Sequence, residues 1–355
     1  MFLVRKLSRS KQDNFELTLI APSTRGYNSG MFSGFLEGIY TESEISFELS
    51  LACLAYGVSF VPGSPHRIDL PNKRVFLKDG QMISFDILVL EPESRLTGED
   101  FEGVKKYANL ASPFESLKKI KQHFSVRNIG LHITIVGAGI CGVELALALN
   151  SLLKNRGRKA DFTIIDASHS VLRGSDPKTQ KIAAAKLKEA DMELLLGHKI
   201  HRVSEELLYF DDQTVLQYDY LIWATEPVGN PIFKDSGFTV DDKGFPLFNQ
   251  FLQSVDAPNI FGTGTGVVFS KNNLPRTDIY AFKQVPCLLR NIKRIGAQAK
   301  LSNCLSLGHT PHLIALGESK GVWRWGNLVL EGKHGYRVKK RRDSKLIERL
   351  TKGLE

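Results

Sequence analysis

The sequence predicts an α/β protein of two domains built on parallel sheets, and three observations support this. The chain has 355 residues, more than one hydrophobic core usually serves, so two domains are the default. Strand-like and helix-like apolar segments alternate through its middle, which is typical of parallel sheets with right-handed crossovers. A hydrophobic fraction of 42% and a charged fraction of 24% are those of a globular protein, which excludes an intrinsically disordered chain.

The pattern of apolar and turn-forming residues over the first 130 positions predicts short strands with two helices among them. Residues 24–40 are rich in glycine and aromatic residues and suit a loop over a ligand. An amphipathic helix is expected over 42–56, and Ser112 with Glu115 predicts a capping box that begins a second helix over 112–124. The expected strands are 15–20, 58–63, 66–70, 73–77 and 86–90.

The clearest motif lies near the middle of the chain. An apolar strand over 132–136 leads into Gly137-x-Gly139-x-x-Gly142, and a helix follows to about residue 155. The first glycine allows a tight turn, the second lets the backbone approach a diphosphate, and the third lets helix and strand pack closely. The helix N-terminus offers N–H groups and partial positive charge to the phosphates. This combination predicts a dinucleotide site in mid-chain.

A second strand over 161–166 ends in Asp166, somewhat further from Gly137 than the usual ~20 residues. The basic stretch 152–160 accounts for the extra length in a longer helix or loop. A carboxylate at this position would accept hydrogen bonds from both ribose hydroxyls and would repel a 2′-phosphate. The site is therefore expected to prefer NADH to NADPH.

Two side chains beside this motif have alternative interpretations. Glu144 lies in the first turn of the helix, where the helix dipole alone favours an acid, and a role near the nicotinamide is the alternative. Cys141 lies within the loop, where a small thiol that fills space is favoured over a redox thiol.

The rest of the chain continues the alternation of strands and helices. Asp176 followed by Pro177 predicts the start of a helix over 177–190, and a further helix is expected over 277–296. The expected strands are 207–212, 218–225, 256–268 and 322–330.

With these flanks included, the chain resembles the two-dinucleotide flavoproteins of the pyridine nucleotide-disulfide oxidoreductase superfamily. Within it, the chain is most similar to type II NADH dehydrogenase-like proteins and to the flavoprotein domain fused to selenide, water dikinase. The order and spacing of the matching pieces, over about residues 15–345, carry the resemblance. These pieces are Pro22-Ser23, Tyr27-Asn28-Ser29-Gly30-Met31, Gly34, Gly38, Tyr40, GAGICGVELA, LIWAT, NIFGTG, Tyr280-Ala281-Phe282, Gln284, Pro286 and HLIALGESKGVWRWGNLVL.

The resemblance implies two Rossmann-like dinucleotide-binding domains, of which the FAD domain is interrupted by the NAD domain. Residues 1–110 and 235–300 would form the FAD-type domain, 111–234 the NAD(H)-binding domain, and 301–355 a small α+β C-terminal segment. It also implies FAD and NADH as cofactors, with electrons passing from NADH through the flavin to quinone or another small acceptor. No acid–base residue is required and no metal site is expected. The implied cofactor-binding residues are Gly137, Gly139, Gly142, Glu144, Asp166, Gly264, Thr265, Tyr280, Ala281 and Gln284.

The sequence departs from the family pattern at the flavin. MFLVRKLSRS looks like the far end of the helix that follows the family's first strand and FAD loop, so the FAD domain is expected to be truncated there. Glu91-Pro92-Glu93 replaces a small-x-Gly turn, and Thr265 replaces an Asp after NIFGTG. Glu226 follows LIWAT where a small residue is usual. A start codon upstream of Met1 would explain the first departure, whereas all of them together favour weakened flavin binding.

This leaves two functional hypotheses. The first is an FAD-dependent NADH oxidoreductase. The second is a degenerate, flavin-poor relative that acts as a nucleotide-binding or accessory protein. Thiol-based reductase chemistry is disfavoured because the four cysteines, Cys53, Cys141, Cys287 and Cys304, show no CxxC or CxxxxC spacing.

The net charge of +9 owes much to residues 333–352, where nine Lys or Arg accompany two acids. From Ser344 on, Leu346, Ile347, Leu350 and Leu354 recur at helical spacing, which predicts a short basic amphipathic helix. Type II NADH dehydrogenases rest on membranes through such segments, and a terminal helix packed on its own domain is the alternative. Nucleic acid is disfavoured as a partner because no aromatic residues are interleaved with the basic ones.

The sequence also indicates where the protein resides. The N-terminus has no apolar core of signal-peptide length, and no run of about 18 apolar residues occurs. The low cysteine count favours a reducing compartment. We therefore expect a cytoplasmic protein with peripheral contact to the inner face of the membrane.

Overall fold

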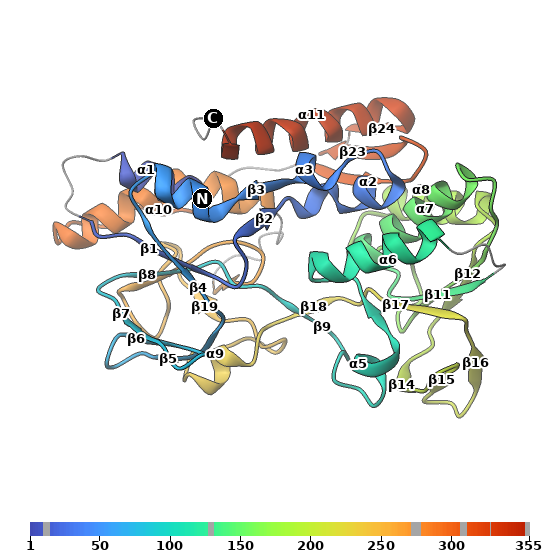
Figure 1. Ribbon diagram of the computed structural model, residues 1–355, viewed down its shortest axis with the longest axis horizontal. Helices are drawn as coiled ribbons and strands as arrows, with labels where there is room; N and C mark the ends of the chain where they lie inside the picture. Colours follow the sequence, from blue (N-terminus) through green and yellow to red (C-terminus); the bar gives the residue numbers. More distant parts are fainter. Residues whose placement is uncertain (10–14, 127–130, 271–277, 306–310, 327, 352–355) are drawn as a thin grey trace.

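The structure is a computed structural model that describes residues 1–9, 15–126, 131–270, 278–305, 311–326 and 328–351. It confirms the α/β class. A five-stranded parallel sheet lies in the middle of the chain, and smaller sheets and helices form a second region (Figure 1).

The five-stranded sheet has the strand order β10, β17, β11, β12, β13, and every neighbouring pair is parallel. Residues 133–136 and 220–223 are buried throughout, as the inner strands of a parallel sheet covered on both faces require. The strands are β10 (Asn109–Leu110), β11 (His132–Val136), β12 (Asp161–Asp166), β13 (Glu193–Leu196) and β17 (Tyr220–Trp223).

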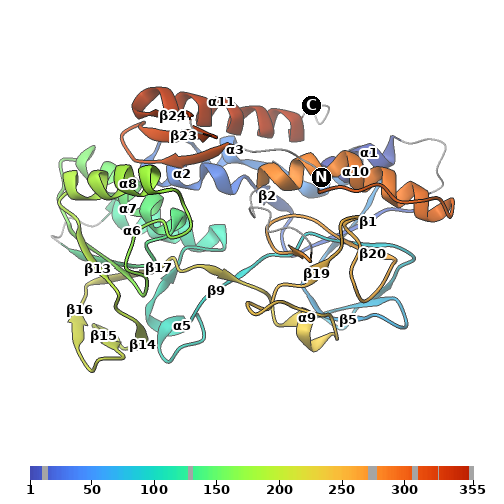
Figure 2. The same cartoon turned by 180° about the vertical axis from the view of Figure 1, so that it is seen from behind.

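Helices cover one face of this sheet and a small antiparallel sheet covers the other (Figures 1 and 2). The helices are α6 (Phe114–Val126), α7 (Ile140–Lys154) and α8 (Pro177–Glu189). The opposite face packs against α5 (Val104–Tyr107), β14 (Ile200–Val203), β15 (Leu207–Phe210) and β16 (Val215–Gln217).

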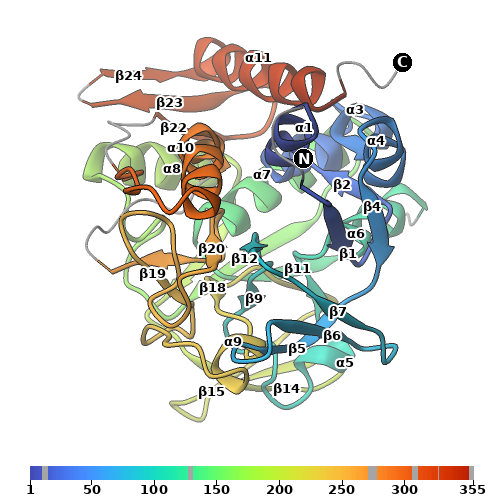
Figure 3. The ribbon, with the colours of Figure 1, turned by 90° about the vertical axis from the view of Figure 1, so that its left-hand side faces the viewer.

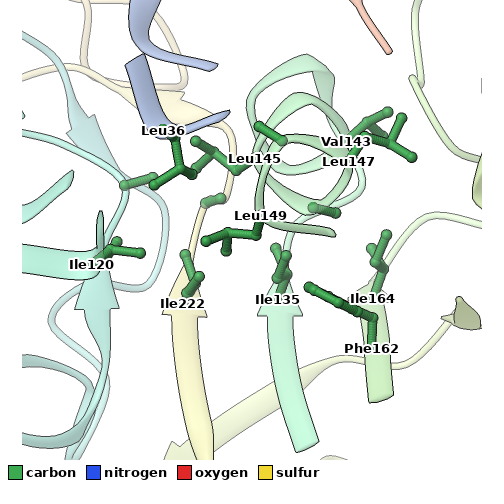
Figure 4. Close-up of a cluster of buried hydrophobic side chains, with 14 of the residues drawn as sticks. Leu36, Ile120, Ile135, Val143, Leu145, Leu147, Leu149, Phe162, Ile164 and Ile222 are labelled. Carbon is green, nitrogen blue, oxygen red and sulfur yellow. The ribbon is translucent and has the colours of Figure 1, made fainter. Parts of the chain in front are cut away.

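Helix α7 is apolar on nearly all sides because the sheet lies under it and α2 (Phe32–Glu37) lies beside it. Figure 4 shows Leu149 above Ile135 and Ile222, and Leu145 next to Leu36 of α2. Each fully buried leucine contributes about 1.5–3 kcal/mol of hydrophobic stabilisation. This packing fixes the position of the α7 N-terminus relative to the sheet.

The second region combines the N-terminal part of the chain with residues that follow the central sheet. Strand β1 (Thr18–Ala21) pairs in parallel with β4 (Ser59–Pro62), and β8 (Leu88–Leu90) pairs in parallel with β20 (Ile260–Gly262). Among the described residues these strands form two separate pairs rather than one sheet. The other elements are α1 (Phe2–Ser8), β2 (Arg25–Tyr27), η1 (Ser29–Met31), α3 (Glu42–Ile45), β3 (Ser46–Glu48), α4 (Leu49–Ala55), β5 (Pro65–Asp69), β6 (Arg74–Leu77), β7 (Met82–Ser84), α9 (Ile232–Asp235), β19 (Leu247–Phe248), β21 (Val268–Phe269) and α10 (Asp278–Gly296).

Two crossings join the regions. Strands β9 (Arg95–Leu96) and β18 (Pro227–Val228) run antiparallel to each other between the regions.

The C-terminal segment consists of the antiparallel strands β22 (His312–Ala315), β23 (Gly321–Trp325) and β24 (Leu328–Glu331), covered by α11 (Gly332–Thr351). Figure 3 shows α11 beside the β23–β24 strands, with α1 and the N-terminus below its far end.

Several expected elements differ from the structure. Residues 24–40 form β2, η1 and α2 rather than a loop. The helix expected over 42–56 is divided into α3 and α4 by β3, because residues 46–48 pair with β2 and Phe47 covers Gly26. Helix α6 begins at Phe114 after a cis Ser112–Pro113 bond, so Ser112 is not its cap. The basic helix begins at Gly332, well before Ser344, and Leu354 lies outside the described residues.

A buried carboxylate holds the C-terminal segment against α2. Glu37 is only 8% exposed, and its Oε1 accepts a hydrogen bond from the backbone N–H of Ser319. The turn that supplies this N–H has three successive left-handed residues, Gly317, Glu318 and Ser319, and the N–H of Glu318 donates to the hydroxyl of Ser151 (3.0 Å). Burial nevertheless raises the pKa of Glu37 to about 7.

We expect Glu37→Gln to stabilise the protein above pH 7 and to leave it unchanged near pH 5. Because the pKa is raised in the folded state, the native protein binds more protons than the unfolded chain between about pH 4.5 and 7, so stability falls as pH rises through that range. Glutamine keeps the acceptor oxygen without the buried charge. Thermal melting at both pH values measures this, with the exposed Glu16→Gln as the control. Equal melting shifts for Glu37→Gln at the two pH values would contradict it.

Candidate functional site

The central glycine motif connects β11 to α7 through backbone contacts that exclude side chains. Gly137 has a φ of 115°, and a Cβ there would lie 2.3 Å from the carbonyl oxygen of Ala224. A Cβ at Gly142 would lie 1.8 Å from the carbonyl oxygen of Gly137. A Cβ at Gly139, by contrast, would have nothing within 4 Å. Two glycines are thus required by the fold, and the third borders open space.

The N-terminus of α7 faces this open space. Gly139 is its N-cap residue and makes no side-chain cap, and Ile140 and Cys141 in the first turn are exposed. The first N–H groups of a helix have no partner within the helix and carry partial positive charge. No side chain among the described residues fills the position over Gly139, so the turn can accept a diphosphate.

Asp166 lies at the carboxyl end of β12, directly beside the glycine turn. Its Oδ2 accepts a hydrogen bond from the backbone N–H of Ala138 (2.6 Å). Its Oδ1 accepts from the backbone N–H (2.7 Å) and the hydroxyl (2.6 Å) of Ser168. The carbonyl of Ala138 accepts in turn from the N–H of Leu172 (2.8 Å). The glycine turn and the segment after β12 are therefore fastened together.

Glu144, one turn into α7, connects this region to the C-terminal segment. Its Oε1 accepts a hydrogen bond from the N–H of Ala315 (2.6 Å). Burial raises the pKa of Glu144, although the nearby Lys339 ammonium and the Ala315 bond oppose the shift. The net effect is a raised pKa, so this carboxyl holds its proton more tightly than an exposed one.

The side chain of Lys339 in α11 is buried near η1 and α7. Its Nζ donates to Asp343 Oδ2 (2.8 Å) and to the carbonyl of Gly30. Burial lowers the pKa of Lys339, but the charges of Glu144 and Asp343 outweigh it and raise the pKa overall. A lysine buried to 5% exposure needs such partners, because an unpaired buried charge is costly. In the sequence, Lys339 is one of nine basic residues over 333–352. Their helical spacing does not reveal that the Lys339 side chain faces the protein interior.

The remaining expected site residues lie in the segment after β20 and in α10. Gly264 has a φ of 92° and lies against Glu91, whose Cγ would be 3.1 Å from a Cβ at Gly264. Thr265 follows in the same turn and is half-buried. Tyr280 is buried and Ala281 is half-buried in the described part of α10. The hydrogen bond between Thr263 and Gln284 joins the segment that carries Gly264 and Thr265 to α10, the helix that carries Tyr280 and Ala281.

Gln284 carries a hydrogen-bond donor that lacks an acceptor. Its Oε1 accepts from the Thr263 hydroxyl (2.9 Å), while its buried Nε2 has no partner among the described residues. An unpaired buried amide N–H costs about 1–3 kcal/mol. A ligand carbonyl placed here would satisfy it, which fits a cofactor that presents acceptor atoms.

The cysteines divide into a pair and two single thiols. Cys287 of α10 and Cys304 form a disulfide, a pairing that the sequence spacing did not predict. Cys53 is buried. Cys141 is exposed at the first turn of α7, so it does not fill buried space as the sequence favoured. Within the described residues, no group of His, Cys, Asp and Glu side chains could hold a metal ion.

Comparisons with known proteins identify the family and the fold. The family model described as pyridine nucleotide-disulphide oxidoreductase matches residues 5–283. Demethylphylloquinone reductase NdbB of Synechocystis sp. is 27% identical over 281 residues, covering 74% of this chain and 69% of its own length. A probable NADH dehydrogenase of Dictyostelium discoideum is 22% identical and covers 55% of this chain. The matched region spans 48% of that second relative.

Solved structures show the same fold at low identity. Sulfide:quinone oxidoreductase from Aquifex aeolicus has a TM-score of 0.80 and 16% identity, covering 99% of this chain and 89% of its own. NDH2 from Plasmodium falciparum in complex with NADH has a TM-score of 0.75 and 13% identity, covering 100% of this chain and 96% of its own.

We expect Gly139→Ala and Gly142→Ala to separate ligand binding from folding. Gly139→Ala should melt within about 2 °C of the wild type and bind NADH at least about tenfold more weakly, because its methyl group enters only the open space. Gly142→Ala should melt much lower or fail to fold, because its methyl group meets a carbonyl at 1.8 Å. Thermal melting and NADH titration measure both. Unchanged NADH affinity in Gly139→Ala would contradict a diphosphate site at this turn.

Proposed function

The chain belongs to the pyridine nucleotide-disulphide oxidoreductase family, and we propose that it is an FAD-dependent NADH oxidoreductase that passes electrons to quinone or another small acceptor. The observation that carries the proposal is the open turn at Gly139, held at the N-terminus of α7 by two side-chain-free contacts. Such a turn matches the needs of a dinucleotide diphosphate.

In this proposal, residues 111–234 form the NAD(H)-binding domain, and Gly137, Gly139 and Gly142 shape the turn that binds the diphosphate. Asp166 contacts the adenosine ribose at the end of β12. Residues 1–110 and 235–300 form the FAD-type domain, and residues 301–355 form the C-terminal segment. The crossings β9 and β18, with β10 in the five-stranded sheet, favour moving these boundaries to about residues 96 and 228.

The residues present fit the flavin end of an FAD site. Gln284 Nε2 is a buried donor that needs an acceptor, and Thr263 links it to the segment of Gly264 and Thr265, while Tyr280 and Ala281 precede it on α10. These residues would hold the cofactor. A bound flavin would supply the two-electron chemistry, while this chain orients the two ring systems and excludes water.

Glu144 and Lys339 supply the proton chemistry beside this site. The pKa of Glu144 is raised by burial, and the charges of Glu144 and Asp343 raise the pKa of Lys339. A reduced quinone needs protons as well as electrons, and these buried groups can hold one near the C-terminal segment. The names of the relatives support a quinone acceptor: one is a demethylphylloquinone reductase, and a structural neighbour is a sulfide:quinone oxidoreductase.

A flavin-poor accessory protein is the second candidate, and one specific observation favours it. The exposed carboxylate of Glu91 lies against Gly264, where it would repel the phosphates of FAD. The parallel strands of this region also form two pairs rather than a continuous sheet. Both features weaken a flavin site without affecting the turn at Gly139.

We expect the purified protein to bind FAD and to show flavin absorbance near about 450 nm that NADH bleaches. Glu91→Gln should increase the affinity for FAD, because it removes a carboxylate next to Gly264. Glu93→Gln, a nearby exposed carboxylate, is the matched control. A colourless protein that resists FAD reconstitution yet is stabilised by NADH would support the accessory role instead.

Contact with a membrane is proposed through the outer surface of α11. Its inward side, with Tyr336, Lys339 and Asp343, packs on the protein, so the apolar stripe expected at Leu346, Ile347 and Leu350 is half-buried rather than free. The exposed side is strongly basic, and anionic lipid attracts such residues at about 1 kcal/mol each. The exposed cations are Lys333, Arg337, Lys340, Arg341, Lys345 and Arg349.

The neighbouring hairpin adds apolar contact. Trp325 and Leu328 are 56% and 55% exposed on β23 and β24, beside α11. Tryptophan is favoured at the membrane–water boundary. No helix in the described part of the chain is both long and apolar enough to cross a bilayer. We therefore propose a peripheral contact with the inner face of the membrane, from the cytoplasmic side.

We expect the double variant Arg341→Glu with Lys345→Glu to bind vesicles of phosphatidylcholine with about 30% phosphatidylglycerol at least about tenfold more weakly. The reason is that the two substitutions together lower the net charge of this surface by four units. Lys181→Glu with Lys188→Glu on the exposed side of α8 makes the same change elsewhere and should bind normally. Vesicle cosedimentation at low and high salt measures this. Equal loss in both double variants would indicate net charge rather than a defined surface.

A further inference from the structure

The carboxylate of Asp166 is already engaged by three donors. A carboxylate has about four acceptor positions, two on each oxygen. The N–H and the hydroxyl of Ser168 occupy both positions on Oδ1, and the N–H of Ala138 occupies one on Oδ2. A ribose that donates both of its hydroxyls to Asp166 needs two positions, so one of the existing donors must leave.

Only the Ser168 hydroxyl can leave at small cost. Ala138, which donates the N–H, is 1% exposed and is also held through its carbonyl by the N–H of Leu172. The Ser168 N–H is fixed by the backbone that follows β12. The hydroxyl, by contrast, rotates about a single bond and has a second acceptor at hand, the carbonyl of Ser170 at 3.0 Å.

We propose that Ser168 determines the nucleotide preference of this site by competing with the ribose for Asp166; this rests on the proposed NADH function. NADH binding exchanges the serine hydroxyl for a ribose hydroxyl on Oδ1. The exchange lowers the affinity for NADH relative to a free carboxylate. A nucleotide with a 2′-phosphate gains from the same residue, because the serine hydroxyl can donate to the phosphate.

The competition gives Ser168 an effect opposite to that of an ordinary binding residue. Removing its hydroxyl frees an acceptor position on Asp166 and removes a donor for a 2′-phosphate. Ser168→Ala should therefore bind NADH about two- to tenfold more tightly and bind NADPH equally or more weakly. The ratio of the two dissociation constants should move toward NADH by at least about threefold.

The experiment titrates the full-length wild type and variants with NADH and NADPH by calorimetry. Ser168→Thr keeps the hydroxyl and should match the wild type, whereas Ser168→Val has the same shape without the hydroxyl and should match Ser168→Ala. This pair keeps the test valid if alanine perturbs the loop. In an Asp166→Ala background, Ser168→Ala should leave the ratio unchanged, because the shared partner is gone.

The outcomes distinguish this inference from the function on which it rests. A wild type that binds neither nucleotide contradicts the NADH site and the inference together. Wild-type binding with an unchanged ratio in Ser168→Ala and Ser168→Val contradicts the inference alone. Weaker NADH binding in both variants would likewise overturn it, because Ser168 would then be an ordinary ligand of the nucleotide.

Discussion

The candidate site depends on the backbone approach between Gly142 of α7 and the carbonyl of Gly137. A single methyl group at Gly142 would lie 1.8 Å from that oxygen, so the helix can sit this close to the end of β11 only without a side chain. The approach places the first N–H groups of α7 beside the carboxyl end of the sheet. The hydrogen bonds of Ala138 to Asp166 and Leu172 hold the turn in this form. The proposed diphosphate site is thus formed by the fold itself.

Helix α7 transmits this constraint to the rest of the molecule. Its apolar surface packs on the sheet and on α2, so neither can shift without moving the glycine turn. Glu144 accepts a hydrogen bond from Ala315, and Lys339 links α11 to Gly30. The C-terminal segment is therefore part of the site's construction, because its buried lysine and the α7 carboxyl offset each other's charge in a low-dielectric environment.

The sequence predicted best what depends on nearby residues. The bounds of β11, α7, β12 and α8 follow from local apolar patterns, glycine spacing and the Asp176 cap, whose side chain accepts from two N–H groups. What failed depends on distant partners. Residues 46–48 leave the expected helix because they pair with β2. Lys339 turns inward because Asp343, Glu144 and Gly30 surround it, and Ser168 matters only through its contact with Asp166; neither arrangement leaves a periodic signal.

The two nucleotide regions differ in what holds them together, and this bears on the choice between enzyme and accessory protein. The NADH turn is maintained by backbone contacts within one continuous parallel sheet. The proposed flavin region depends on side chains from separate segments. The Nε2 atom of Gln284 has no hydrogen-bond acceptor among the described residues, and Glu91 lies against Gly264. Strands β1 and β8 each pair on one side only among the described residues. Weakened flavin binding would therefore leave NADH binding intact, because the two sites do not share their main restraints. The redox activity thus depends on the region with the weaker restraints.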